Sequence, residues 1–147
     1  MGEAAIDGAR YRLLVAEDDG EMRRLVAGEL RRDGYHVDEA ASGRELRELV
    51  VTALVRANTA QPATALPHLI VSDVRMPGWT GLDLLEHLRD RGSDLPVVLI
   101  TAFGDRDMHE RAARLGAVAV LDKPFDCDEL RRVVFRTLLS FYRERVG

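Results

Sequence analysis

The chain has 147 residues, a length that suits one domain with a hydrophobic core of ordinary size. Its 21 basic and 25 acidic residues leave a formal net charge of -4, which gives no indication of a nucleic-acid-binding module. The single cysteine excludes an internal disulfide, and the sequence has neither a signal-peptide-like start nor a run of about 20 apolar residues that would span a bilayer. We therefore expect a cytoplasmic domain that binds neither membrane nor nucleic acid directly.

The first part of the chain alternates short apolar runs with amphipathic helical stretches. The predicted elements here are strands over 11–16 and 35–40 and helices over 20–33 and 43–57. The second strand is the more polar one, as an edge strand should be. Apolar residues on one face of the first helix are Met22, Leu25, Val26 and Leu30. Ser42, with Glu45 three residues later, predicts a capping box at the start of the second helix.

A loop over 58–67, rich in small residues and proline, leads into the rest of the chain. The predicted elements that follow are strands over 68–72, 96–100 and 117–121 and helices over 81–91, 105–115 and 128–143. Central runs that are continuously apolar favour a parallel sheet covered by helices on both faces. Right-handed crossovers then give a doubly wound α/β fold of five strands and five helices. We expect a flexible N-terminus over 1–9, one domain over 10–143, and a tail or the start of a linker over 144–147.

Polar side chains that can do chemistry stand at the ends of four predicted strands. In chain order they are Glu17, Asp18, Asp19, Asp73, Thr101 and Lys123. Because ligands bind at the carboxyl ends of parallel strands, we expect these residues to meet at one rim of the sheet. Each has a plainer interpretation when taken alone, and Asp19 is best explained as the cap of the first helix.

Carboxylates crowded at one rim are costly to bury unless a cation compensates for their charge. Oxygen ligands of this kind suit Mg²⁺. A lysine and a hydroxyl group at the same rim are the partners that a phosphoryl group needs. An aspartate placed there, such as Asp73, can act as a nucleophile towards phosphorus and form an aspartyl-phosphate.

Four segments together resemble the receiver domain of bacterial two-component response regulators. They are LLVAEDD (13–19), LIVSDVRMPGWTGLDLL (69–85), VVLITA (97–102) and LDKPF (121–125). The resemblance covers the chain from about residue 10 to residue 142, and the ordered set is far more specific than any one motif. It implies a flavodoxin-like sheet with the strand order 2-1-3-4-5.

The resemblance also implies a set of metal ligands. Asp18 would bind Mg²⁺ directly, and Glu17 would act mainly through water. Asp73 and the backbone carbonyl of Arg75 would complete the ligands that the protein supplies.

For the reaction, the resemblance implies that Asp73 is the phosphoacceptor. Thr101 would be the switch hydroxyl, and Lys123, followed by a cis bond to Pro124, would pair with the phosphoryl oxygens. The donor would be a sensor histidine kinase or a phosphotransfer protein. Phosphorylation would change the segment after Thr101 and the face of the fourth and fifth helices. The chain would catalyse its own phosphotransfer and autodephosphorylation without being a conventional enzyme.

Three features depart from the family's pattern. Val120 stands where the family usually has an aromatic residue that turns inward with the threonine, and Phe103 is either a substitute for it or an ordinary loop residue. Arg75 puts a long cation near the site, where it would either stabilise added phosphate charge or weaken metal binding. The segment 50–67 is longer than most receivers need. The extra length is an extended helix, a partner surface or a tolerated surface insertion.

The last predicted helix carries two apolar stripes. The expected core stripe is Leu130, Val133, Val134, Leu138 and Phe141, and the second stripe is Phe135, Leu139 and Tyr142. The second stripe indicates either a homodimer or partner interface through the fourth and fifth helices, or cover by a neighbouring helix. The chain is either a stand-alone receiver or the N-terminal piece of a regulator whose C-terminal output domain is missing.

Two other classes compete with the receiver interpretation. Phosphatases with an aspartate nucleophile have a second aspartate two residues later, and Arg75 at that position argues against them. A receiver-like interaction module that is never phosphorylated would not need the full set of site residues found here. No glycine-rich fingerprint follows the first strand, so dinucleotide binding is poorly supported.

Overall fold

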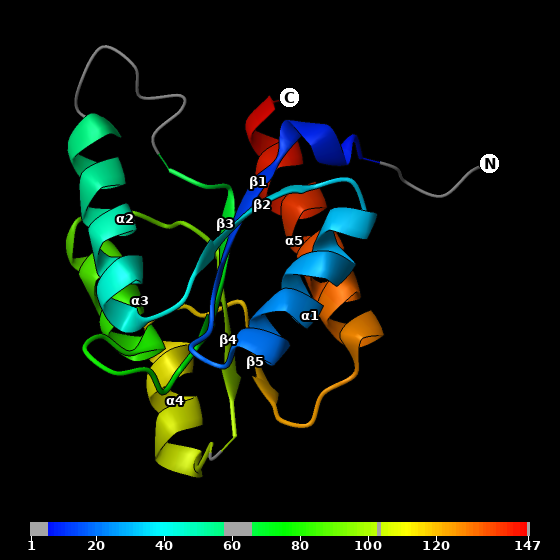
Figure 1. The fold of residues 1–147 in the computed structure, drawn as a ribbon. Helices are drawn as coiled ribbons and strands as arrows, with labels where there is room; N and C mark the ends of the chain where they lie inside the picture. Colours follow the sequence, from blue (N-terminus) through cyan, green and yellow to red (C-terminus); the bar gives the residue numbers. More distant parts are fainter. Residues whose placement is uncertain (1–5, 58–65, 103, 147) are drawn as a thin grey trace.

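The computed structural model describes residues 6–57, 66–102 and 104–146. Within them, five parallel strands form one sheet in the order β2-β1-β3-β4-β5 (Figure 1). The strands are β1 (Arg12–Ala16), β2 (His36–Ala40), β3 (Leu69–Asp73), β4 (Val97–Thr101) and β5 (Ala119–Asp122). The helices are η1 (Gly8–Arg10), α1 (Gly20–Arg32), α2 (Gly43–Ala57), α3 (Gly81–Asp90), α4 (Arg106–Arg114) and α5 (Cys127–Val146). The predicted doubly wound fold and its strand order are confirmed.

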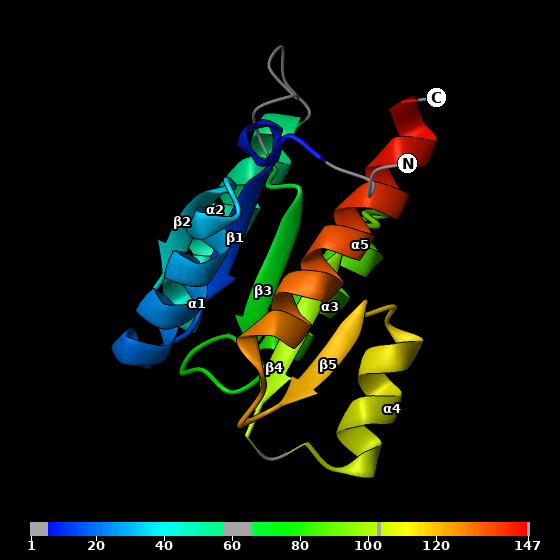
Figure 2. The same ribbon diagram turned by 90° about the vertical axis from the view of Figure 1, so that its right-hand side faces the viewer.

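Helices cover both faces of the sheet. α1 and α5 lie on one face and α2, α3 and α4 on the other, while β2 and β5 form the two edges (Figures 1 and 2). Alternate residues of a strand contribute to opposite cores, so that Leu13 packs with α1 and α5, and Leu14 packs with α2 and α3. Every residue of β3 and β4 is buried, because helices lie on both sides of these central strands.

The buried face of α1 differs from the prediction at one position. Val26 and Leu30 are buried as expected, but Leu25 is 49% exposed, so placing it on the buried face was wrong. Ala27 takes its place in the core. Successive helix residues are about 100° apart, so Leu25 and Ala27 flank Val26 on opposite sides, and only one flank can face the sheet. The side with the small alanine does so.

The predicted cap of α2 is present, with a shifted partner. Ser42 Oγ accepts the N–H of Glu45 at 3.1 Å. The carboxylate of Glu45 accepts the N–H of Ala41 at 3.3 Å, whereas a reciprocal capping box would use the N–H of Ser42 itself. The first interaction satisfies an N–H group that the first turn of the helix leaves without a helical partner, and the second ties the residue before the cap to the helix.

Two of the first described residues pack against the domain, and the last helix extends past its predicted end. Ile6 packs against the core beside α1, and the side chain of Asp7 caps η1. Gly8 lies so close to the end of α1 that a Cβ there would be 2.6 Å from the carbonyl oxygen of Asp33. Ile6 and Gly8 are therefore packed, whereas Asp7 and Ala9 are exposed. The flexible N-terminus expected over 1–9 stays a prediction, and residues 1–5 lie outside the described part. At the other end, α5 continues to residue 146, past the expected limit at 143.

The two stripes of α5 have different surroundings. Leu130, Val134 and Leu138 are fully buried in the core between α5, α1 and the sheet. Phe135 lies one turn after Arg131, whose guanidinium binds the Asp33 carboxylate at the end of α1 at 2.7 and 2.9 Å. The second stripe therefore runs along the side of α5 that is nearer to α1. Its last member, Tyr142, donates its hydroxyl to the carbonyl of His68 at 2.6 Å and packs against the core.

No helix within the described residues is long and apolar enough to cross a membrane.

Candidate functional site

The end of β1 delivers the first acidic residues to the rim of the sheet. Glu17 follows β1 directly and is only 3% exposed, and its N–H donates to the carbonyl of Ala40 at the end of β2. Asp18 is exposed beside it. Asp19 caps α1 by accepting the N–H groups of Glu21 and Met22, which confirms its predicted role as a helix cap.

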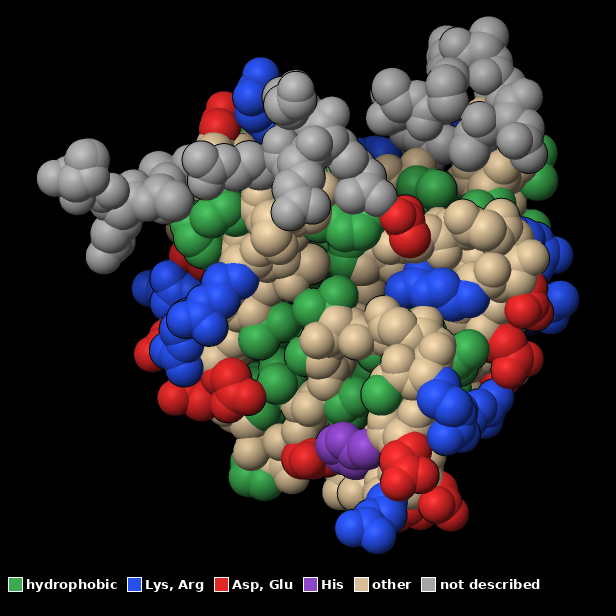
Figure 3. Space-filling view, turned by 180° about the vertical axis from the view of Figure 1, so that it is seen from behind, with side chains coloured by type: hydrophobic (Ala, Val, Ile, Leu, Met, Phe, Trp, Pro, Cys, Tyr) green, Lys and Arg blue, Asp and Glu red, His purple; other side chains and the backbone are tan. Residues whose placement is uncertain are grey.

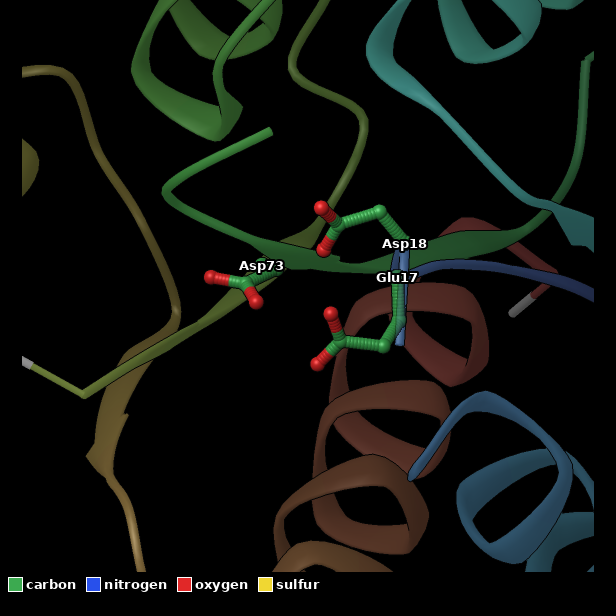
Figure 4. A group of neighbouring side chains, drawn as sticks. All are labelled: Glu17, Asp18 and Asp73. Atoms are coloured by element: carbon green, nitrogen blue, oxygen red, sulfur yellow. The ribbon is translucent and has the colours of Figure 1, made fainter. Parts of the chain in front are cut away.

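Asp73 comes from the neighbouring strand. It is the last residue of β3, whereas the sequence placed it just after the strand, and it is 6% exposed. Its Oδ1 accepts the N–H of Arg75 at 3.0 Å. Carboxylate oxygens of Glu17, Asp18 and Asp73 all lie within 4.8 Å of one another. Figure 4 shows these three carboxyl groups gathered around one spot at the ends of β1 and β3.

Lys123 extends from the end of β5 into the same cluster. Its Nζ donates to Glu17 Oε1 at 2.8 Å and to Asp73 Oδ2 at 2.9 Å. The backbone N–H of Lys123 donates to the carbonyl of Thr101 at 2.7 Å, which joins the ends of β4 and β5. Thr101 is 1% exposed and lies at this same rim, and the Lys123–Pro124 bond is cis as expected.

Burial and mutual proximity control the protonation of this cluster. Burial, and then the hydrogen bond and charge of Asp73, raise the pKa of Glu17 to about 7 against the opposing effect of Lys123. Burial lowers the pKa of Lys123, but its hydrogen bonds to Glu17 and Asp73 outweigh this, so the pKa of Lys123 lies above its ordinary value. The ammonium group therefore stays charged while Glu17 titrates near neutral pH.

The donor set fits a hard divalent cation. Three ionised carboxylates against one ammonium would leave two negative charges in excess, and all of the cluster's acceptors are oxygens. Asp18 provides an exposed carboxylate on the solvent side of the buried pair. Glu17, Asp18 and Asp73 could therefore hold a metal ion. The expected role of the Arg75 carbonyl stays a prediction, and the Arg75 residue as a whole is exposed.

The departures noted in the sequence have the following outcomes. Val120 is half-buried and packs against the core on the α2, α3 and α4 face. Phe103 lies outside the described residues, as do residues 58–65. Of the long segment 50–67, the first part continues α2 as far as Ala57.

Sequence reasoning missed two residues that support the site from a distance. Arg23 Nη1 in α1 donates to the carbonyl of Glu17 at 3.0 Å, and Arg23 Nε donates to Glu39 Oε1 in β2 at 3.1 Å. The polar pattern of 35–40 predicts an edge strand, and nothing in the sequence indicates that Glu39 has a partner on the preceding helix. Only the three-dimensional register of α1 over β2 brings this pair together.

Known proteins place this arrangement in a family. The family model of the response regulator receiver domain matches residues 13–135 of this chain. The C4-dicarboxylate transport transcriptional regulatory protein DctD of Pseudomonas aeruginosa is 36% identical over 130 residues, which cover 88% of this chain and 26% of that protein. Sporulation initiation phosphotransferase F of Bacillus subtilis is 28% identical over 127 residues, covering 86% of this chain and 93% of that protein.

A solved structure shows the same fold. The Francisella response regulator 1452 receiver domain superimposes with a TM-score of 0.70 at 27% identity, covering 85% of this chain and 94% of that one. The chain thus spans about a quarter of the length of the DctD relative and nearly all of the phosphotransferase F relative. The fold, the rim of acidic residues and the family model agree: this chain belongs to the response regulator receiver domain family, whose members are phosphoacceptor switches.

Proposed function

We propose that Asp73 accepts a phosphoryl group from a phosphohistidine on a sensor histidine kinase or a phosphotransfer protein. The observation that carries this proposal is the contact of Lys123 Nζ with both Glu17 and Asp73 at 2.8 and 2.9 Å, in a cluster that includes Asp18. A carboxylate oxygen of Asp73 would form the new P–O bond while the P–N bond breaks. The imidazole would leave with the electron pair of that bond and take up a proton.

The neighbouring side chains have separate roles in this step. Lys123, which balances the charge of the carboxylates at rest, would pair with the phosphoryl oxygens once they are attached to Asp73. Thr101 would donate its hydroxyl to the same group and so change the segment that follows β4. Attack of water on the phosphorus would release phosphate and restore the carboxylate. In this proposal the chain promotes its own phosphorylation and dephosphorylation and is not a conventional enzyme acting on a separate substrate.

We infer that the metal at this site is Mg²⁺. Its direct protein ligands would be Asp18, Asp73 and the backbone carbonyl of Arg75, with Glu17 acting mainly through water. Oxygen donors alone, with one carboxylate open to solvent, suit an ion that keeps several of its waters. When bound, Mg²⁺ would neutralise charge on the phosphoryl oxygens.

The direct test is phosphorylation of the purified chain with acetyl phosphate and Mg²⁺, followed by intact-mass measurement. We expect the wild type to gain one phosphoryl group and Asp73→Asn to gain none. Asp107→Asn, which changes an exposed acid in the first turn of α4, should behave like the wild type. A folded wild type that never gains mass would favour the pure interaction module. Steady turnover of a generic phosphomonoester would favour the phosphatase class.

We also propose that the chain pairs with a second copy of itself through the face formed by α4 and α5. Figure 3 looks onto the β5 edge and shows hydrophobic side chains across the middle of this face, between α5 and α4. Val118, just before β5, is 42% exposed. The second stripe of α5 adds little support, because it lies nearer to α1. Sedimentation with beryllofluoride should show a dimer that Val118→Lys weakens, and a monomer mass independent of concentration would count against pairing.

The proposal also covers the partners of the chain, the compartment in which it acts and the domain that reads its state. Receiver domains work with sensor kinases or phosphotransfer proteins, and we propose that the exchange takes place in the cytoplasm. DctD is a transcriptional regulatory protein in which a segment like this chain is about a quarter of the length. We propose that an output domain of that kind, joined or separate, reads the phosphorylated state of the chain.

A further inference from the structure

The backbone of Glu17 is held on both sides by groups that lie on β2 or are attached to it. Its N–H donates to the carbonyl of Ala40, the last residue of β2, at 3.1 Å. Its carbonyl accepts Nη1 of Arg23, a residue in the first turn of α1, at 3.0 Å. The edge strand β2 contributes no side chain to the acidic cluster, yet it fixes the segment that carries two of the three carboxylates.

Arg23 is itself fixed by a shared carboxylate. Its Nε donates to Glu39 Oε1 at 3.1 Å, and the two side chains are only 16% and 25% exposed. The other oxygen of Glu39 binds Nη1 of Arg31 at 3.0 Å, two turns further along α1. A planar guanidinium with two bonds in fixed directions is oriented much better than a single exposed ammonium would be. Arg23 therefore meets the Glu17 carbonyl from a defined position.

The Glu17 carbonyl is a sensitive point in the geometry of the site. It belongs to the planar peptide group that joins Glu17 to Asp18, so a bond to it restrains the backbone torsions between these two residues. Three carboxylates within 4.8 Å repel one another when no divalent cation is bound. Movement of the backbone segment that carries Glu17 and Asp18 would let these carboxylates move apart and relieve the repulsion. The bond from Arg23 to the Glu17 carbonyl opposes that movement.

We propose that Arg23 is a positioning residue for the metal-binding carboxylates, acting through the backbone carbonyl of Glu17. The inference rests on the proposed Mg²⁺-dependent function of this site. The described side-chain contacts of Arg23 go to that carbonyl and to Glu39, and none goes to a carboxylate of the cluster. Its effect is therefore on how well the carboxylates are preorganised for a cation, and it takes no direct part in binding.

The test compares two arginines that share Glu39. Mg²⁺ affinity is measured by isothermal titration calorimetry on the whole chain. Arg23→Met should weaken it about tenfold, the size of loss typical when support behind metal ligands is removed. Arg31→Met removes the other bond to Glu39 and a bond to the Val37 carbonyl, but leaves the Glu17 carbonyl bound, so its Mg²⁺ affinity should be unchanged. Arg23→Lys should fall between Arg23→Met and the wild type.

Urea unfolding without Mg²⁺ shows whether each variant is folded and separates lost stability from lost preorganisation. If the wild type binds Mg²⁺ and a folded Arg23→Met or Arg23→Lys binds it equally tightly, the positioning role is refuted and the proposed function stands. Equal weakening by Arg31→Met would also refute it, because the contacts of Glu39 with Arg23 and Arg31 would then be a general support for α1. If the wild type binds no Mg²⁺, the proposed function fails, and the inference fails with it.

Discussion

The ammonium nitrogen of Lys123 lies 2.9 Å from Oδ2 of Asp73, and it lies 2.8 Å from Glu17 Oε1. Both carboxylates are less than 10% exposed, while the Lys123 side chain is 21% exposed. One cation at the end of β5 therefore joins the ends of β1 and β3 across the rim. Removal of a partner from a largely buried ion pair leaves uncompensated charge.

Lys123→Met should therefore destabilise the metal-free protein. We expect a loss of about 2 kcal/mol at pH 8, below the range for a fully buried pair because solvent reaches the ammonium group. Mg²⁺ should stabilise the variant more than it stabilises the wild type, because the ion then has more negative charge to neutralise. Urea unfolding with and without Mg²⁺ measures both effects.

Arg111→Met is the matched control for the lysine variant. Arg111 pairs with Glu86 at 3.1 Å, and both side chains are about half exposed, so its loss should change stability by less than about 0.5 kcal/mol. Equal destabilisation by the two substitutions would show that the contacts of Lys123 with Glu17 and Asp73 have no special role in stability.

Glu17→Gln should change how stability depends on pH. The pKa of Glu17 rises from 4.5 to about 7 on folding, chiefly through burial, so between these values the folded state holds a proton that the unfolded state has released. The stability of the metal-free wild type should therefore fall as pH rises from 4.5 through 7. Glu17→Gln should lack that fall and be the more stable protein at pH 8, by up to about 3 kcal/mol. Thermal unfolding across this pH range in EDTA measures the difference, and parallel curves for the two proteins would contradict the assignment.

Most of the site could be predicted because parallel strands end at a common edge. Once the apolar runs before Glu17, Asp73, Thr101 and Lys123 are recognised as strands, the meeting of these residues at one rim follows without knowledge of any side-chain contact. The order of strands came from the family resemblance. The sequence pattern alone shows five strands without their lateral arrangement.

The unpredicted contacts come from long side chains whose partners depend on how elements pack. Arg89 at the end of α3 donates to the carbonyls of Leu115, Ser93 and Leu95 at 2.8 to 3.0 Å, and it thereby ties the end of α4 to the loop before β4. In the sequence it is one arginine among many on amphipathic helices. Its partners are backbone carbonyls, and these leave no residue-type signal.

Gly43→Ala should damage the loop that follows the proposed phosphoacceptor. A Cβ on Gly43 would lie 2.2 Å from the carbonyl oxygen of Trp79 and 2.7 Å from that of Pro77, and backbone atoms cannot move aside as a flexible side chain can. We expect a loss of about 2 kcal/mol or more, together with a shifted emission spectrum from Trp79, the single tryptophan of the chain.

The control for this substitution is another helical glycine. Gly28 in α1 has no atom within 4 Å of the place where a Cβ would be. Gly28→Ala should therefore stabilise the protein by about 1 kcal/mol through helix propensity alone, with unchanged Trp79 emission. A Gly43→Ala variant as stable as the wild type would show that the start of α2 and this loop are not in the close contact described.

His68 predicts a second pH effect, at the opposite end of the sheet from the acidic cluster. Its Nδ1 accepts the backbone N–H of Arg12 at 3.0 Å, which requires an unprotonated Nδ1, and its ring packs edge-on against Tyr11 and Tyr142. Burial, and then the charge of Arg12, lower the pKa of His68 below its ordinary value of 6.5. A base with a lowered pKa in the folded state contributes stability that is present above 6.5 and is lost as pH falls through the folded-state value. His68→Asn, whose amide oxygen can accept the same N–H, should be less stable at pH 7.5 but should lose less on acidification. Titration of the His68 ring protons by NMR checks the cause directly, and a midpoint at or above 6.5 would rule it out.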